Sequence, residues 1–174
     1  QIRYLSFFFG LISILSFFNI IYSYYLNLYL NLNTYYYSLI ISLFISIIFY
    51  NIKIFKKKIS IFDKILTVFL GYLIIPFILS IPFYFSIYNL TFLNSYFEAI
   101  SGFTSTGFSI FENIKHIDQS LILWRSSTQW LGGLYFLFSI ILLIDIYDEN
   151  FKKTLTNFIF FDSSEIFKQA IKIF

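Results

Sequence analysis

Glu98 to Gly107 reads EAISGFTSTG, and Leu123 to Gly133 reads LWRSSTQWLGG. The surrounding chain is 59% hydrophobic and only 12% charged, whereas soluble domains carry about 25% charged residues. A run rich in Thr, Ser and Gly cannot face lipid, because its backbone polar groups would have no partners there. Irregular backbone at membrane depth is tolerated inside protein or along a water-filled path, as in carbonyl-lined ion pathways. The two stretches therefore indicate a membrane transport or channel protein.

Long apolar runs predict the helices that cross the membrane, since a spanning helix needs about 20 such residues. The runs that qualify are Tyr4 to Leu26, Tyr35 to Ile54, Lys64 to Tyr88 and Leu121 to Tyr147. The third run contains Pro76 and Pro82, so we expect it to bend or to end early near Pro82. None of the runs shows the alternation of a membrane barrel, and the sequence predicts an all-α integral membrane fold with four transmembrane helices.

A shorter apolar stretch, Phe92 to Ile100, lies between the third and fourth runs. About 10 residues of helix cannot cross a ~30 Å hydrocarbon core, but they suit a re-entrant pore half-helix. Asn89 or Thr91 can cap its start with a side-chain oxygen. Gly102 can end it, because Gly tolerates the left-handed cap conformation.

The distribution of positive charge predicts how the chain is oriented. Lysines gather between the second and third runs and after the fourth, at Lys53, Lys56, Lys57, Lys58, Lys64, Lys152, Lys153, Lys168 and Lys172. Arg3 precedes the first run, and the loop 27–34 carries no charge. Because cytoplasmic loops are enriched in Lys and Arg, we expect both ends of this segment on the cytoplasmic side of the inner membrane. The half-helix then enters from outside, and the net charge of +3 requires no nucleic-acid partner.

The residues after the half-helix are the candidate ion site. A half-helix directs its negative dipole end at the residues that come after it, here Thr104, Ser105, Thr106 and Gly107. Successive carbonyls of this segment can replace a cation's hydration shell, and Gly107 supplies a backbone conformation closed to other residues. Oxygen ligands without a carboxylate suit a monovalent ion better than Ca²⁺ or Mg²⁺. We therefore predict a selectivity filter for a transported monovalent cation, with no cofactor.

Residues beside this segment are candidates for supporting it: Glu98, Gly102, Phe108, Arg125 and Gln129. Glu98 either adds negative potential near the ion or bonds to neighbouring backbone and hydroxyl groups. Arg125 either braces the loop, with its charge reaching polar surroundings, or meets the ion. Gln129 can brace the segment from behind.

The residues FEAISGFTSTGFS at 97–109 and LILWRSSTQWLGG at 121–133 resemble the first pore repeat of the Trk/Ktr potassium transporters. The resemblance is specific over Ser95 to Gly133, and the helix pattern agrees over the rest of the chain. It implies a potassium-channel-like fold in which four helix–pore–helix repeats of one chain surround the pathway. Thr104 to Gly107 would supply one quarter of the filter, with Gly107 as the filter glycine. It also implies potassium uptake without covalent chemistry, a cytoplasmic nucleotide-binding regulatory subunit, a homodimer of the full-length chain and contact with membrane lipid.

The same resemblance divides the chain into three parts. Residues 1–58 would be two preceding transmembrane helices, 59–147 the first helix–pore–helix repeat with its filter loop, and 148–174 a cytoplasmic amphipathic segment leading to a further repeat. The other three repeats are absent from these residues, and the chain opens on Gln1 rather than Met. We therefore expect the N-terminal portion of a longer transporter.

Two alternatives remain open. Four copies of the chain could surround one pore as a short homotetrameric cation channel. The chain could also be a non-conducting membrane structural subunit or a transporter remnant, with the Gly-rich loop as a buried helix connector. An enzyme is disfavoured, because the single His116 and the scattered acids form no recognisable nucleophile–base pair. With no Cys, disulfides and thiolate metal sites are excluded.

Overall fold

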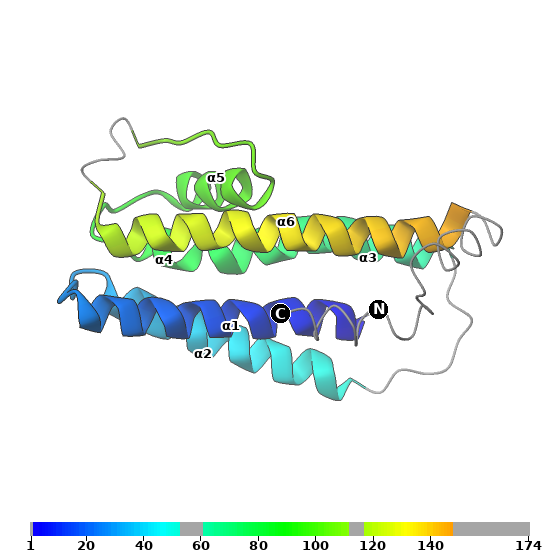
Figure 1. Ribbon diagram of the computed structural model, residues 1–174, viewed down its shortest axis with the longest axis horizontal. Coiled ribbons are helices and arrows are strands. Elements are labelled where there is room, and N and C mark those ends of the chain that lie inside the picture. Colours follow the sequence, from blue (N-terminus) through cyan, green and yellow to red (C-terminus); the bar gives the residue numbers. More distant parts are fainter. Residues whose placement is uncertain (1, 53–60, 112–116, 148–174) are drawn as a thin grey trace. The chain divides into compact units, whose positions relative to one another are not determined.

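The computed structural model describes residues 2–52, 61–111 and 117–147. Over these residues it is helical and contains no strand (Figure 1). The helices are α1 Ile2–Tyr25, α2 Leu32–Asn51, α3 Ile61–Leu79, α4 Ile81–Tyr84, α5 Phe92–Phe103 and α6 Gln119–Tyr147. The predicted cytoplasmic segment 148–174 and the lysine loop at 53–60 lie outside the described residues.

The chain divides into two compact units, Gln1–Leu137 and Phe138–Phe174. The first unit contains α1 to α5 and the first part of α6. Of the second unit, the described residues are 138–147, which form the C-terminal end of α6.

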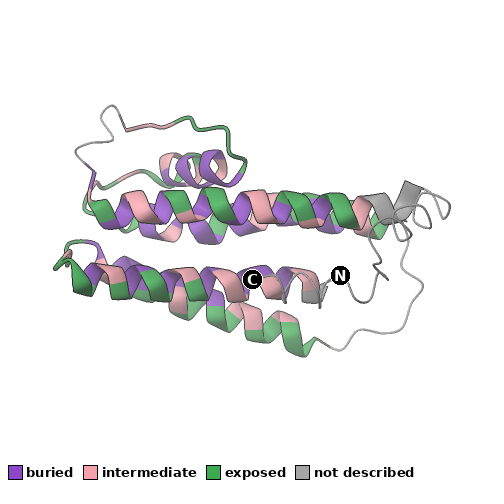
Figure 2. Ribbon diagram, in the orientation of Figure 1, coloured by how far each residue is buried: buried purple, intermediate pink, exposed green. Residues whose placement is uncertain are grey.

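Within the described ranges, four segments are long and apolar enough to cross a membrane, at Tyr4–Tyr25, Leu32–Asn51, Phe62–Tyr84 and Gln119–Leu143. Figure 2 shows exposed residues along most of α2, and many of these are large and apolar, such as Ile40, Phe44 and Ile47. Apolar surface of this extent suits contact with lipid tails rather than with water. The predicted all-α integral membrane fold is confirmed, and the chain is a multi-pass membrane protein.

The two prolines shape the end of the third span. Pro76 lies inside α3, and Pro82 lies in the first turn of α4, where its missing N–H is not needed. Between the two helices, Ser80 N donates to Pro76 O at 2.9 Å and Tyr84 N donates to Ser80 O at 2.9 Å. The span ends at Tyr84 rather than at Tyr88, which confirms the predicted early end near Pro82.

Small polar side chains join α1 to α2, which pack as a hairpin (Figure 1). Ser6 Oγ donates to Ser46 O and Ser46 Oγ donates to Ser6 O, each at 2.9 Å. Nearer the turn, Ser16 Oγ donates to Ser38 Oγ at 3.1 Å. Small hydroxyl residues suit a membrane interior, because they allow close helix approach and hydrogen bonds between helices where burial from water supplies no attraction.

A buried polar network joins the start of α2 to the start of α6. Asn31 is fully buried; its Nδ2 donates to Asp118 Oδ2 at 2.8 Å, and its Oδ1 accepts from Ile87 N at 3.1 Å. Ser120 Oγ donates to the same Asp118 oxygen at 2.8 Å and accepts from Tyr35 OH at 2.9 Å. The network holds the start of α2, and with it the α1–α2 hairpin, against the start of α6.

Replacing Asn31 with Ala should lower the free energy of unfolding by about 1–2 kcal/mol, because two hydrogen bonds are lost and a buried N–H is left unpaired. Thermal unfolding in detergent micelles would measure the loss. Asn33→Ala is the matched control, since Asn33 lies two residues further along α2 and is exposed; it should change stability by less than about 0.5 kcal/mol. Equal effects of the two substitutions would contradict a stabilising role for the network.

Candidate functional site

The half-helix α5 has 12 residues, which is about 18 Å of helix and too short to span the membrane. Six of its residues are buried: Ser95, Glu98, Ala99, Ser101, Gly102 and Phe103. Thr91 caps its start, accepting from Asn94 N at 3.3 Å, which confirms one of the two predicted caps. Asn89 instead adopts a left-handed conformation, with φ 47°, in the preceding turn.

The half-helix ends at Phe103, and a left-handed Ser105 with φ 56° closes it. Ser105 N donates to Gly102 O at 3.0 Å, and Thr106 N donates to Ser101 O at 3.1 Å. This pair of bonds is the Schellman closure, which usually places Gly at the left-handed position. The prediction that Gly102 ends the helix in this conformation is wrong; Ser105 takes that place, because Gly102 is needed for packing.

Two glycines bring the backbone of α5 directly against α6. A Cβ at Gly102 would collide with Thr128 Oγ1, and a Cβ at Gly132 would collide with the carbonyl group of Phe103. At Gly133 a Cβ would meet nothing within 4 Å. Gly132 therefore fixes where the last residue of the half-helix rests, and Gly133 does not.

The segment from Thr104 to Gly107 leaves this helix end as exposed, irregular backbone. Among the described residues, no donor bonds to the carbonyl oxygens of Thr104, Ser105 or Thr106. Gly107 has φ +80°, and a Cβ there would meet nothing within 4 Å. Backbone conformation, rather than crowding, therefore requires glycine at this position.

Hydroxyl groups tie the segment back to its helix. Thr104 Oγ1 donates to Ile100 O at 2.7 Å, and Thr106 Oγ1 donates to Ser101 O at 3.2 Å. Ser101 Oγ donates to Phe108 O at 2.7 Å. Ser101 was not among the residues selected from the sequence. The feature that could have identified it is a small hydroxyl side chain one helical turn before the polar segment.

Glu98 and Arg125 form a buried ion pair behind the segment. Glu98 is fully buried, and its Oε2 lies 3.5 Å from Arg125 Nε without a hydrogen bond between these two atoms. Its Oε1 accepts from Ser109 Oγ at 2.7 Å and from the N–H of Ile110. Breaking a buried pair by removing one partner is costly, because the remaining charge is left uncompensated.

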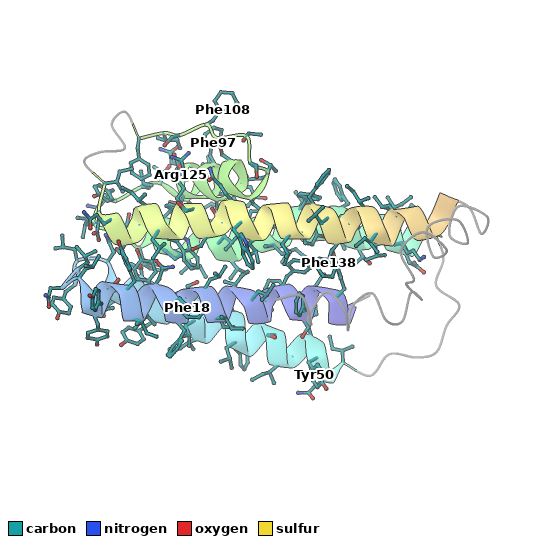
Figure 3. The ribbon with its side chains drawn as sticks, viewed as in Figure 1. Phe18, Tyr50, Phe97, Phe108, Arg125 and Phe138 are labelled. Atoms are coloured by element: carbon teal, nitrogen blue, oxygen red, sulfur yellow. The ribbon has the colours of Figure 1, made fainter. Side chains whose placement is uncertain are left out.

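The guanidinium of Arg125 also holds the backbone at the last residue of the filter segment, Gly107, and at the residue after it, so the Gly107 carbonyl, predicted as an ion ligand, accepts a hydrogen bond within the chain. Its Nη2 donates to Gly107 O at 3.3 Å and to Phe108 O at 3.0 Å, and Figure 3 places Arg125 between α6 and the extended segment after α5. A planar, forked donor can serve a carboxylate and two carbonyls at once. Arg125 thus makes bracing contacts, and Glu98 bonds to neighbouring backbone and hydroxyl groups, each as one of its two predicted roles requires. The other roles, negative potential from Glu98 and contact of Arg125 with the ion, stay predictions.

The side chains of the remaining two candidates make no such contacts with the part of the chain that the structure describes. The Phe108 side chain is 70% exposed, and Figure 3 shows it pointing away from α5. Gln129 is exposed on α6 and makes no side-chain hydrogen bond to the described residues. Supporting roles for these two side chains stay predictions.

Comparison with known proteins gives one family match and several similar proteins. The TrkH family model, described as a cation transport protein, matches residues 36–162. An uncharacterized cation transporter of Methanocaldococcus jannaschii is 33% identical over 110 residues, which cover 62% of this chain and 23% of that protein. No solved structure matches the chain.

Two further relatives carry the name Trk system potassium uptake protein. TrkI of Halomonas elongata is 38% identical over 55 residues, which are 32% of this chain and 11% of that protein. TrkG of Escherichia coli is 35% identical over 46 residues, which are 26% of this chain and 10% of that protein. The matched residues thus span less than a quarter of each relative.

Gly132→Ala should destabilise the protein by about 1–3 kcal/mol, because the added methyl group overpacks a contact with backbone that cannot move aside. Gly133→Ala is the control on the same helix; it should be neutral or stabilising by up to about 1 kcal/mol, as helix propensity favours Ala. Thermal unfolding of the two variants would measure the difference. A Gly132→Ala protein as stable as wild type would show that α5 does not rest on α6 at this point.

Proposed function

Because the chain belongs to the TrkH cation transport protein family, we propose that it takes part in potassium uptake across the cytoplasmic membrane. The backbone of Thr104 to Gly107 carries this proposal. It comes after the C-terminal end of the half-helix, whose last three residues are buried, and has three carbonyl oxygens that no described residue bonds. Such carbonyls can replace the hydration shell of a cation. Potassium is the favoured ion, since two relatives are named as potassium uptake proteins.

The charges around the segment support a monovalent ion. The C-terminal end of α5 contributes a partial negative charge, which attracts a cation. The nearby carboxylate, Glu98, is paired with Arg125 and accepts from Ser109 and Ile110, so its charge is compensated. Ca²⁺ and Mg²⁺ usually recruit carboxylate ligands. A site of carbonyl and hydroxyl oxygens suits a cation that loses its water readily.

One half-helix and one filter segment can form only one side of a pathway. Large apolar side chains remain exposed near the site on α5 and α6, including Phe97 and Trp130. We infer that residues 59–147 act as one helix–pore–helix repeat beside three others. In this proposal the others belong to a longer transporter chain, which agrees with the small part of each relative that the match covers. A homotetramer of this chain is the competing assembly.

The resemblance to Trk/Ktr transporters supports further parts of the proposal. Residues 1–58 would be two preceding transmembrane helices, and a nucleotide-binding regulatory subunit would act from the cytoplasmic side. The lysines between the second and third spans and after the fourth favour the cytoplasmic side for both ends of the segment. The full-length chain would form a homodimer. Transport of this kind needs no covalent chemistry, so the chain would not be an enzyme.

Gly107→Ser should lower rubidium uptake roughly tenfold or more, because small displacements of positioned groups are costly. The open space around Gly107 leaves a left-handed strain of about 1–2 kcal/mol as the main cost to folding, so the variant should still insert. Uptake would be measured in cells whose growth depends on the protein at limiting potassium. Gly133→Ser is the control with the same chemical change at an open helix position.

Unchanged uptake by Gly107→Ser would contradict the filter assignment. The purified 174-residue chain in liposomes distinguishes the assemblies. Rubidium-selective flux from this chain, abolished by Gly107→Ser, would show that copies of it form a pore without further repeats. Inserted protein without flux would favour one repeat of a larger pore.

A further inference from the structure

Tyr135 of α6 lies at the centre of an aromatic cluster that includes Phe103, the last residue of the half-helix. It is fully buried, and its hydroxyl donates to Val68 O on α3 at 2.9 Å. A side chain at Gly71 would collide with the Tyr135 ring, so α3 provides the space that this ring occupies. The ring is therefore fixed at its hydroxyl end by α3 and at its backbone by α6.

One side of the Tyr135 ring contacts the end of the half-helix. Its centroid lies 5.3 Å from that of Phe103, the last residue of α5, and 4.9 Å from that of Tyr72. Phe103 and Tyr72 are themselves 5.7 Å apart in an edge-on arrangement. Thr104, the first residue of the candidate filter, comes directly after Phe103. A displacement that reaches the backbone of Phe103 therefore also displaces the first filter carbonyls.

The Tyr135 ring also contacts α1. Phe8 is fully buried and packs edge-on against Tyr135, with ring centroids 4.8 Å apart and planes at 75°. Tyr4, one turn earlier on α1, lies 5.7 Å from the same ring. Aromatic pairs at these separations attract one another beyond simple burial. A continuous series of ring contacts therefore runs from α1 through Tyr135 to the residue before the filter.

We propose that Phe8 is a positioning residue for the filter, acting through Tyr135 on Phe103. This inference rests on the proposed function. It assigns a role to α1, which lies before residues 36–162 that match the family. The preceding helix is then part of the support of the filter and not only a membrane anchor.

Packing explains why a distant side chain can matter here. Interiors are packed densely enough that a missing group leaves a cavity which the surroundings fill only in part. Phe8→Ala removes the ring that supports Tyr135 from the α1 side, so Tyr135 and Phe103 can shift toward the space. Sites that select by geometry tolerate displacements of only about 0.5 Å. We therefore expect Phe8→Ala to lower the ion selectivity of the inserted protein, and not only the amount of protein that is inserted.

The test compares Phe8→Ala with Phe18→Ala, the same change on the same helix at a side chain that is 58% exposed (Figure 3). The full-length protein is assayed in cells, and rubidium and sodium uptake are normalised to the amount of inserted protein. Phe8→Ala should lower the rubidium-to-sodium uptake ratio by about threefold to tenfold, below the ~100-fold that a 1 Å misplacement can cost. Phe18→Ala should leave the ratio unchanged, and Phe8→Leu, which loses the ring but keeps an apolar side chain, should lower it less than Phe8→Ala but more than Phe18→Leu does. If Phe8→Ala does not insert, the comparison of Phe8→Leu with Phe18→Leu decides.

A second measurement does not depend on transport. These residues contain no Cys, so Ser105→Cys can be labelled with a membrane-impermeant thiol reagent, with the protein lacking this substitution as background. Phe8→Ala should change the labelling rate at position 105 by about threefold or more, in the range expected for the uptake ratio, and Phe18→Ala should not. A labelling rate unaffected by Phe8→Ala, or altered equally by both substitutions, would overturn the inference. Failure of the wild type to take up rubidium would overturn the proposed function instead, and labelling would still decide the role of Phe8.

Discussion

The direct approach of the α5 backbone to Gly132 of α6 is the contact on which the candidate site depends. It fixes where the carbonyl group of Phe103 lies, and the filter segment starts at the next residue. A half-helix of 12 residues has too few turns to hold itself in place, since short helices depend on tertiary packing for their stability. Gly102 against Thr128 adds a second close approach. The absence of side chains at Gly102 and Gly132 therefore helps to determine where the half-helix lies.

The polar segment after this helix end has two parts, which differ in whether their carbonyl oxygens accept hydrogen bonds. The carbonyls of Thr104, Ser105 and Thr106 receive no hydrogen bond from the described residues. The carbonyls of Gly107 and Phe108 accept from Arg125, whose charge is balanced by buried Glu98. Hydrogen bonds from a charged guanidinium are roughly twice as strong as those between neutral groups. The hydrogen bonds from Arg125 to Gly107 O and Phe108 O can thus hold Thr104 to Thr106 in a fixed geometry without occupying the carbonyl oxygens of these residues, which an ion would need.

The elements that sequence predicted well are those set by local composition. Apolar run length gave the four spans, and Pro82 gave the early end of the third. The left-handed position at the end of α5 was predicted at Gly102, because Gly is the residue most often found there. Gly102 instead lies within α5 and packs against Thr128, and Ser105 adopts the left-handed conformation. The bond between Asn31 and Asp118 joins residues 87 positions apart, and no local pattern encodes such a pair. Glu98 and Arg125 were selected because they lie inside the two quoted motifs, although the sequence did not reveal which groups they would bond.

The contacts between the first two helices and the rest of the first unit reflect how helices associate in lipid. Lipid tails are as apolar as Leu, so association needs close packing and hydrogen bonds. The polar network of Asn31 provides such bonds at the start of α6, and the rings of Phe8 and Tyr135 provide close packing deeper in the same unit. Attachment at two depths restrains tilting of α1 and α2 as well as their separation. A hairpin that served only as a membrane anchor would need neither contact, and this is the physical reason to regard it as part of the support of the site.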